Sequence, residues 1–250
     1  MEIKMIVLDL DGTILHDDKS LSDYSKDIIQ KCRKKGIKVI FATVRGTIDD
    51  VVPLDLFDGY VIKSGALAYD SGTLIYKRVM SIDDVRGLLL ACDKAGLKIV
   101  AENSDDGICY TNFSVTDVWS KKYEIANFTE MKFNSDKIYI IIESAEAVNI
   151  IKKNLPKGVH LFVSRDNFAF ISHEEAVKSK AAAALAKRWD IKRENIVSFG
   201  DDLIDIDILQ YSGIGVATGN ALLEVKEVAD YICDTNNNDG VAKWIEERIL

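Results

Sequence analysis

A strand, a helix and a second strand follow one another at the start of the chain, and this order constrains the fold most strongly. Ile3–Leu10 is an apolar run of strand length, rich in branched residues, as in strands that are buried on both faces. A helix is expected from Ser22, which can cap it, to Gly36, which can end it, and Ile37–Ala42 is the second apolar run. This spacing predicts a parallel sheet with helices on its faces.

The middle of the chain has a different pattern. A helix is expected from Ser81 to Gly96, and several strand candidates then follow with one helical segment, Ala145–Leu155, among them. The candidates are Leu97–Ala101, Ile108–Asn112, Ile138–Glu143, Val159–Val163 and Phe168–Ser172. Clustered strands with few helices predict an α+β module with a largely antiparallel sheet.

From about residue 174 the alternation of helices and strands returns. Helices are expected over Lys178–Trp189, Leu203–Tyr211 and Leu222–Val228 and in a last segment through Trp244, with strands at Ile196–Phe199, Gly213–Ala217 and Tyr231–Cys233. The Asn236–Asn238 run is expected to be a polar loop. We therefore predict an α/β protein whose Rossmann-like parallel-sheet core, residues 1–80 and 173–250, is interrupted by an inserted α+β domain, residues 81–172.

The composition excludes several classes of protein. Of the 250 residues, 48% are hydrophobic and 29% are charged, which is typical of a globular chain and not of a disordered or membrane-embedded one. The net charge of −8 disfavours nucleic acid and anionic membranes as partners. Four cysteines without a CxxC pair, and an N-terminus without a signal-peptide core, predict a reduced cytoplasmic protein. Either a monomer or a homodimer is compatible with the sequence.

Acidic residues follow two of the predicted core strands. Asp9 and Asp11 stand at the end of the first strand, and Asp201 and Asp205 follow the strand Ile196–Phe199. The carboxyl ends of parallel strands are where ligands bind in such sheets. Carboxylates that lie close together repel one another unless a cation intervenes, and Mg²⁺ prefers carboxylate oxygens. The alternative is that Asp11 begins a turn and that Asp201 or Asp202 caps a helix.

Two further residues are suited to binding an anion. Thr43 follows the second strand, where a hydroxyl and the next backbone N–H groups can form a phosphate-sized site, although a threonine here can equally be a helix cap. Lys178 opens a predicted helix, a position that the helix dipole makes unfavourable for a cation unless an anion lies nearby. Taken alone, Lys178 is more often a solvated surface charge, and Lys180 is its nearby competitor.

Together these residues resemble the haloacid dehalogenase (HAD) superfamily of phosphohydrolases. The shared motifs, in chain order, are Asp9-Leu10-Asp11-Gly12-Thr13, Thr43, Lys178 and Gly200-Asp201. The insertion between Thr43 and Lys178 resembles the large α/β cap of the Cof-like branch (subclass IIB). The segments Gly215–Ala221, Val225–Lys226, Ala229–Asp230 and Asp239–Val241 are similar to that branch as well.

The resemblance implies a Mg²⁺-dependent phosphatase that acts on small phosphorylated metabolites, such as sugar phosphates. Asp9 would be the nucleophile that forms an aspartyl-phosphate, and Asp11 would be the general acid and base. The implied metal ligands are Asp9, the backbone carbonyl of Asp11, and Asp201. The implied phosphate-binding residues are Asp9, Asp11, Gly12, Thr43, Val44, Arg45, Lys178 and Asn220, and Asp205 and Asp202 would lie behind them, with Asp205 orienting Lys178.

Three positions depart from the pattern of the family. Val44 replaces a glycine, Ser64 replaces an asparagine before Gly65, and Ile204 replaces an asparagine before Asp205. The loss of a polar side chain at Ile204 can alter metal affinity or turnover. Two alternatives therefore stay open: a phosphotransferase or mutase with the same intermediate, and a non-catalytic binding protein with a decayed site.

Substrate specificity is expected in the inserted domain. Its polar and aromatic candidates are Glu102, Asn103, Tyr110, Asn112, Trp119 and Tyr123. Such aromatic residues more often form the core of a domain than a substrate pocket. His160 and His173 are expected to be structural or exposed and not catalytic.

Overall fold

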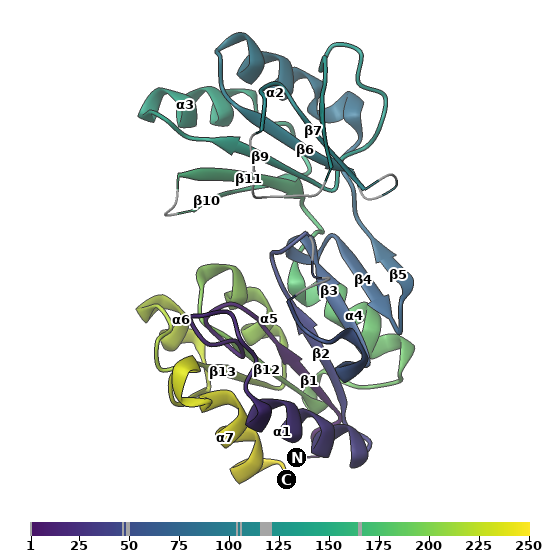
Figure 1. The fold of residues 1–250 in the computed structure, drawn as a ribbon, viewed down its shortest axis with the longest axis vertical. Coiled ribbons are helices and arrows are strands. Elements are labelled where there is room, and N and C mark those ends of the chain that lie inside the picture. Colours follow the sequence, from purple (N-terminus) through teal and green to yellow (C-terminus); the bar gives the residue numbers. More distant parts are fainter. Residues whose placement is uncertain are drawn as a thin grey trace. The chain divides into compact units, whose positions relative to one another are not determined.

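The computed structural model describes residues 2–46, 48, 51–103, 105, 107–115, 122–164 and 167–250. It separates into two compact units, one formed by Met1–Lys77 with Val177–Leu250 and the other by Arg78–Ala176 (Figure 1). The second unit therefore begins three residues before, and ends four residues after, the range 81–172 that was expected from the sequence. Residues 174–176 stay with the second unit because Glu174 donates its N–H to the carbonyl of Gly158 and Glu175 pairs with Arg78 at 2.7 Å.

The first unit is built on a sheet that the described residues form from eight strands, in the order β14-β13-β12-β1-β2-β3-β4-β5. Their bounds are β1 Met5–Leu8, β2 Lys38–Ala42, β3 Gly59–Ile62, β4 Leu67–Asp70, β5 Thr73–Lys77, β12 Ile196–Gly200, β13 Ile214–Ala217 and β14 Tyr231–Ile232. The pairs from β14 to β3 are parallel, and β4 and β5 are antiparallel additions. The three strands β2, β1 and β12 are neighbours, so their carboxyl ends meet at one edge of the sheet.

Helices cover both faces of this sheet. They are α1 Asp23–Lys34, α4 Lys178–Arg188, α5 Ile206–Tyr211, α6 Leu223–Val228 and α7 Gly240–Arg248. Met5 and Val7 of β1 share a buried cluster with Leu185 of α4. On the opposite face, the ring of Phe199 meets that of Trp244 in α7, with centroids 5.3 Å apart. Because side chains alternate along each strand, both faces of the strands are buried, as the continuous apolar runs predicted.

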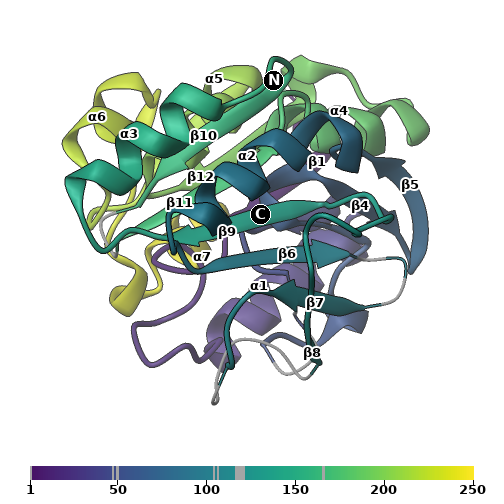
Figure 2. The same ribbon diagram turned by 90° about the horizontal axis from the view of Figure 1, so that it is seen from above.

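The second unit contains a mixed sheet with the order β10-β11-β9-β6-β7-β8. Its strands are β6 Ile99–Asn103, β7 Ile108–Thr111, β8 Tyr123–Ile125, β9 Lys137–Ile141, β10 Val159–Val163 and β11 Phe168–His173, and its helices are α2 Ile82–Lys94 and α3 Ala145–Asn154. The two helices pack together on one face of the sheet, where Leu88, Ile140 and Ile151 share the core (Figure 2). Of its strand pairs, β7 with β8 is parallel and the others are antiparallel.

The predicted fold class is confirmed: a parallel-sheet core carries an inserted α+β unit. Three local predictions need correction. The β4–β5 hairpin, which turns at Ser71 and Gly72 with φ of 48° and 83°, was not predicted from the sequence, and neither was β8. The segment Asn236–Asn238 is a 3₁₀ turn and not an open loop, since Asn236 is 3% exposed and bonds to the loop after β1. No helix in the described part of the chain is long and apolar enough to cross a membrane.

Candidate active site

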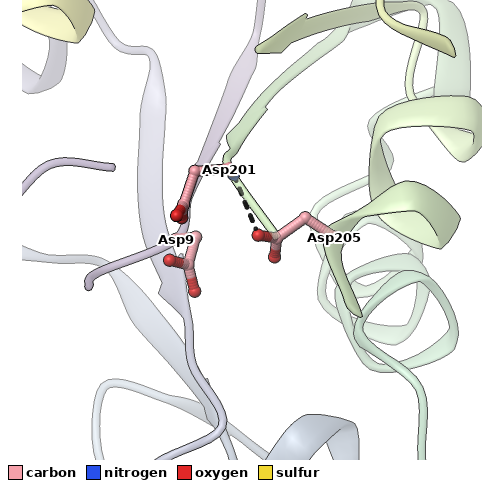
Figure 3. Close-up of side chains that lie close together, drawn as sticks. All are labelled: Asp9, Asp201 and Asp205. Carbon is pink, nitrogen blue, oxygen red and sulfur yellow. Dashed lines mark hydrogen bonds between the residues drawn. The ribbon is translucent and has the colours of Figure 1, made fainter. Parts of the chain in front are cut away.

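Three carboxylates meet at the edge of the core sheet where β1 and β12 end. Oxygen atoms of Asp9, Asp201 and Asp205 all lie within 4.8 Å of one another (Figure 3). Asp9 follows β1 and Asp201 follows β12, which are parallel neighbours, and Asp205 ends the 3₁₀ turn Leu203–Asp205. Asp9 is 7% exposed and Asp205 is 1% exposed, so the cluster is largely removed from water.

Asp205 holds the loop after β12 in place. One oxygen, Oδ2, accepts the backbone N–H groups of Asp201 and Asp202, each at 3.1 Å. Its other oxygen, Oδ1, lies 2.6 Å from Nζ of Lys178. A side chain at Gly200 would have no room, because its Cβ would lie 2.4 Å from Cβ of Asp205. Both oxygens of Asp205 are therefore used within the protein.

Lys178 is the buried cation of this cluster. It opens α4 and is 1% exposed, and its Nζ lies 2.5 Å from Oδ1 of Asp9 as well as 2.6 Å from Asp205. Burial lowers the pKa of Lys178, but the charges of Asp205 and Asp9 outweigh burial and raise it above its usual value. Asp207 supports the same helix end, since its Oδ2 accepts the N–H of Ser179 at 2.9 Å. Lys178 is therefore buried beside two anions and is not the solvated surface charge that the sequence left as the alternative.

Three carboxylates share the cation of Lys178 in this cluster, and the pKa values of two of them, Asp9 and Asp201, are raised. Burial, and then the charge of Asp205, raise the pKa of Asp9 well above its usual value. The same two causes raise the pKa of Asp201 to about 7. Crowded, buried carboxylate oxygens are the donor set that a hard divalent cation such as Mg²⁺ prefers. The residues therefore fit a divalent metal ion held by Asp9 and Asp201.

Gly12 leaves room beside this cluster. Its φ is +79°, and a Cβ at this position would lie 2.5 Å from Oδ2 of Asp201. The next residue, Thr13, donates its hydroxyl to Oδ1 of Asp201 at 2.9 Å. The loop after β1 therefore approaches Asp201 with a hydrogen bond on one oxygen and a glycine next to the other. Any side chain at residue 12 would occupy the space beside that second oxygen.

Asp11 lies outside the three-carboxylate cluster, although the sequence placed it with the other acids. Its Oδ2 accepts Nε of Arg45 and its Oδ1 accepts Nη2 of Arg45, each at 2.6 Å. Nζ of Lys19 lies 2.9 Å from the same Oδ1. Burial raises the pKa of Asp11, but the hydrogen bonds from Arg45 and Lys19 outweigh burial and lower it. Arg45, expected to bind phosphate, is here the partner of Asp11.

Thr43 is buried at the end of β2, with 1% of its surface exposed. Its Oγ1 accepts the N–H of Arg45 at 3.2 Å, so this amide is hydrogen-bonded inside the turn. Its carbonyl accepts the N–H of Ser64, which has a φ of 59° before Gly65. The turn thus brings the hydroxyl of Thr43 close to the backbone of Arg45, as an ST-type turn does.

The outer predicted residues have structural contacts. Asp202 is exposed and accepts the N–H of Leu203 at 2.6 Å, which is the capping role that the sequence left open. Asn220, predicted to bind phosphate, donates to the carbonyl of Gly12 at 2.7 Å and accepts the N–H of Asn236 at 3.0 Å. Lys19, Asp207 and Asn236 were missed. The partners of Asp207 and Asn236 lie far away in the sequence, and Lys19 reaches Asp11 only because the loop between them folds back.

The candidates in the second unit vary in their surroundings. The amide of Asn112 bonds to the backbone of Ile99 and Leu97, and the ring of Tyr110 lies 3.9 Å from that of Phe133, so both belong to the framework. Glu102 and Asn103 are buried in β6 and Tyr123 is half-buried in β8. His160 is exposed, and His173 accepts the N–H of Glu175 at 3.0 Å. Trp119 lies outside the described residues.

Comparison with known proteins agrees with this geometry. The sequence profile of the haloacid dehalogenase-like hydrolases matches residues 6–245. A 5-amino-6-(5-phospho-D-ribitylamino)uracil phosphatase of Bacillus subtilis (strain 168) is 30% identical over 100% of this chain and 97% of its own length. A phosphoglycolate phosphatase of Methanobrevibacter smithii is 25% identical, with 100% of each chain covered.

The fold has close counterparts among solved structures. A HAD-superfamily phosphatase from Bacteroides thetaiotaomicron superimposes with a TM-score of 0.83 and 26% identity, covering 98% of this chain and 95% of the other. The profile match spans nearly the whole chain, including both acidic strand ends and the inserted unit. The chain therefore belongs to the haloacid dehalogenase-like hydrolases, and within them it is a phosphatase of the Cof-like branch.

Proposed function

We propose that this phosphatase hydrolyses small phosphorylated metabolites with the help of Mg²⁺ and through an aspartyl-phosphate on Asp9. The observation that carries the proposal is the position of Asp9, whose buried carboxylate lies against Lys178 and within 4.8 Å of Asp201 and Asp205. The named substrates of the two curated relatives, a phosphoribitylamino-uracil and phosphoglycolate, are both small phosphate esters. Sugar phosphates belong to the same substrate class.

Asp9 has one oxygen available for attack. Its Oδ1 is held by Lys178, which leaves Oδ2 to form a bond with phosphorus while the ester bond to the leaving oxygen breaks. Lys178 and the hydroxyl of Thr43 would hold the phosphoryl oxygens. A like-charge approach of carboxylate and phosphate costs about 4 kcal/mol per unit pair at 4 Å and an effective dielectric near 20. The buried ammonium offsets repulsion of this size.

The metal ion would be held by Asp9, Asp201 and the backbone carbonyl of Asp11. When bound there, Mg²⁺ would supply positive charge beside the phosphoryl oxygens. Asp205 stays a positioning residue in this scheme, because its two oxygens already hold Lys178 and the backbone of Asp201 and Asp202. Asp202 is the cap of the same turn.

Asp11 would move the protons. In the first step it gives a proton to the leaving oxygen, and in the second it accepts a proton from the water that attacks the phosphorus of the aspartyl-phosphate. The pairing of Asp11 with Arg45 and Lys19 keeps its carboxylate ionised, as the second step requires. The first step requires Asp11 to leave these cations and to carry a proton.

We further propose that the second unit, Arg78–Ala176, is the cap that determines which leaving group is accepted. Glu102, Asn103 and Tyr123 remain candidates for that role. The net charge of −8 disfavours nucleic acid as a partner, and we keep a cytoplasmic monomer or homodimer in the proposal. None of the three departures, Val44, Ser64 and Ile204, removes a residue with a proposed chemical role.

A panel of phosphate esters assayed with and without Mg²⁺ tests the proposal. We expect the wild-type protein to release inorganic phosphate from small sugar and acid phosphates, and Asp9→Asn to release none. A newly phosphorylated or isomerised sugar in place of free phosphate would assign a phosphotransferase or mutase. No turnover across the panel, with identical behaviour of the wild type and Asp9→Asn, would assign a non-catalytic protein.

A further inference from the structure

Two cations converge on the carboxylate of Asp11. Arg45 contacts both of its oxygens at 2.6 Å, and Nζ of Lys19 lies 2.9 Å from Oδ1. The side chain of Asp11 is 30% exposed, that of Arg45 28% and that of Lys19 57%. Two cations thus lie within hydrogen-bond distance of one carboxylate.

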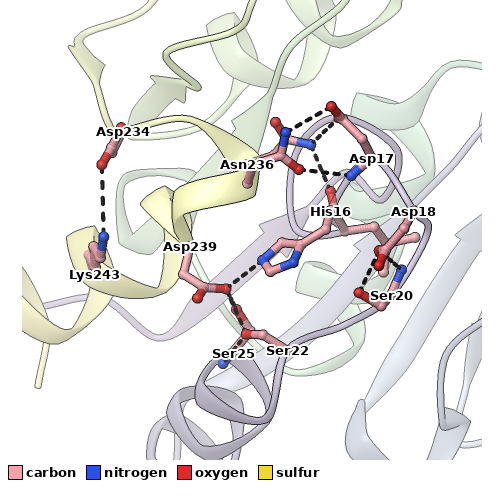
Figure 4. Close-up of polar contacts among 12 residues, drawn as sticks. His16, Asp17, Asp18, Ser20, Ser22, Ser25, Asp234, Asn236, Asp239 and Lys243 are labelled. Carbon is pink, nitrogen blue, oxygen red and sulfur yellow. Dashed lines mark hydrogen bonds and ion pairs between the residues drawn. The ribbon is translucent and has the colours of Figure 1, made fainter.

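Lys19 reaches Asp11 from a tight loop with an unfavourable backbone. Its φ is +68°, in the left-handed region that costs a non-glycine residue about 1 kcal/mol. The loop closes through the N–H of Lys19 to the carbonyl of His16 at 2.9 Å and the N–H of His16 to the carbonyl of Ser20 at 3.0 Å. Asp18 secures the turn by accepting both the N–H and the hydroxyl of Ser20 (Figure 4).

The segment Asn236–Asp239 holds this loop from outside. Nδ2 of Asn236 donates to the carbonyl of Leu15 and to Oδ1 of Asp17, each at 3.0 Å. The amide of Asn237 exchanges two hydrogen bonds with Asp17. These contacts join residues more than two hundred positions apart in the chain, so the place of the loop does not depend on its local sequence alone.

Asp239 fixes the other end of the loop. Its Oδ1 accepts Nε2 of His16 at 3.0 Å, the hydroxyl of Ser22 at 2.6 Å and the hydroxyl of Ser25 at 3.2 Å (Figure 4). One carboxylate thus joins the loop to the start of α1 and to the start of α7. The backbone of Lys19 is strained and anchored on both sides, which is typical of functional positions and unusual for a surface lysine.

We infer that Lys19 and Arg45 form an anion subsite that binds a second anionic group, a carboxylate, on the leaving group of the substrate. The inference rests on the proposed function, in which Asp11 serves the leaving oxygen. The substrate carboxylate takes the place of the Asp11 carboxylate between the two cations. Asp11 is then free to turn toward the leaving oxygen.

The distances limit where the second anionic group can be. A general acid lies about 3 Å from the oxygen that it protonates, and Nζ of Lys19 lies 2.9 Å from an oxygen of Asp11. The carboxyl group of Asp11 turns about its own Cα–Cβ bond from Lys19 to the leaving oxygen, so the subsite and that oxygen are separated by the swing of one short side chain and a hydrogen bond. A carboxylate carried a few carbons beyond the ester carbon spans such a separation. The subsite thus selects small phosphorylated carboxylic acids over the corresponding neutral alcohols.

Matched pairs of substrates test the inference. Phosphoglycolate and 2-hydroxyethyl phosphate differ by a carboxylate in place of a hydroxymethyl group, and so do 3-phosphoglycerate and glycerol 3-phosphate. We expect wild-type kcat/KM to favour the carboxylate in at least one pair. Lys19→Gln should lower kcat/KM for that acid by at least about tenfold more than for its neutral partner, since Lys19 also contacts Asp11, which serves both substrates. Lys19→Arg should restore the preference.

Lys26→Gln is the matched control, because Lys26 also lies in an ion pair of 2.9 Å, with Asp23, and its loss changes the net charge equally. It should behave as the wild type. Equal losses on the acid and its neutral partner in Lys19→Gln would overturn the inference, and so would the absence of any preference in the wild type. Hydrolysis of the neutral partners by the wild type would show that the proposed phosphatase reaction stands in either case.

Discussion

Nζ of Lys178 lies 2.5 Å from Oδ1 of Asp9, and both side chains are buried beneath the edge of the core sheet. The same Nζ reaches Asp205 at 2.6 Å. One ammonium group therefore orients the proposed nucleophile and offsets much of the repulsion among the carboxylates. Removing this cation affects both the reaction and the folded state.

Lys178→Met should lower kcat by about 10²- to 10³-fold, because the charge beside the phosphoryl oxygens is lost. It should also lower the free energy of unfolding by about 3 to 5 kcal/mol, since Asp9 and Asp205 stay buried without their partner. Steady-state kinetics and urea unfolding measure the two effects. Lys180→Met is the control, because Lys180 is exposed two residues further along the helix and should change neither quantity much. Similar losses in both variants would contradict the account.

The free energy of unfolding of the metal-free protein should contain a contribution that falls as the pH rises from about 4 to 7. The pKa of Asp201 is raised to about 7 from 3.8, so the folded state binds more protons than the unfolded state between about pH 4 and 7. Its contribution to the free energy of unfolding therefore decreases by about 2 to 4 kcal/mol as the pH rises through that window. Denaturant unfolding with a chelator present, at several pH values, measures the decrease.

Two controls separate this effect from other titrations. Asp201→Asn should remove most of the decrease, and saturating Mg²⁺ should reduce it because the ion stabilises the charged carboxylates. The pKa of Asp11 is lowered, so its contribution to the free energy of unfolding increases as the pH rises, and it does so below about pH 4. A free energy of unfolding that rises from pH 4 to 7 without metal would contradict the proposed crowding of buried carboxylates around Asp201.

Gly12→Ala should weaken both metal binding and turnover. The new Cβ would lie 2.5 Å from Oδ2 of Asp201, and the positive φ of +79° adds about 1 kcal/mol of backbone strain. Gly36→Ala separates the two effects, because Gly36 has a φ of +82° but nothing within 4 Å of the added Cβ. We expect both variants to lose stability through the backbone strain, Gly12→Ala to lose more because of its contact with Asp201, and only Gly12→Ala to need at least about tenfold more Mg²⁺ for half-maximal activity. Equal Mg²⁺ requirements would argue against a metal ion beside Asp201.

Asp205 and Asp202 should differ sharply although both cap the same turn. Asp205→Asn weakens the contact to Lys178, so kcat should fall by about 10²-fold. Asp202→Asn keeps a good capping residue at an exposed position, so kcat should stay within about twofold of the wild type. Comparing the kcat of the two purified variants, with their melting temperatures as a folding control, checks this. A large loss in Asp202→Asn would mean that Asp202 acts in the site.

The sequence was sufficient for the fold class and for the residues that end the core strands. Asp9, Thr43 and Asp201 follow buried apolar runs, and parallel pairing then brings such positions to one edge whatever the rest of the chain does. Lys178 was singled out because a cation at a helix start is favoured by a nearby anion, but its role, and its choice over Lys180, came from the resemblance to the HAD motifs. The strand ends thus follow from local pattern and simple topology, and the lysine does not.

The rest depends on contacts that no local pattern records. The side chain of Asp11 pairs with Arg45 and does not join the cluster of Asp9, Asp201 and Asp205. The loop after β1 turns at Gly12, and this turn directs Asp11 away from the cluster. Asn236 was read as part of a polar loop, yet it is buried against a loop more than two hundred residues earlier. The β4–β5 hairpin was not predicted because its strands are short and β5 is at most half-buried. The Ser71-Gly72 turn is the one sequence signal that could have indicated it.

Direct detection of the intermediate on Asp9 tests the central claim most sharply. A substrate carrying a radioactive phosphoryl group is mixed with enzyme and Mg²⁺, quenched within one turnover in acid, and the protein is digested and analysed by mass spectrometry. We predict an acid-stable, hydroxylamine-labile phosphoryl group on the peptide that contains Asp9, and no label in Asp9→Asn. Turnover without any label, a label on another residue, or full activity in Asp9→Asn would contradict the account.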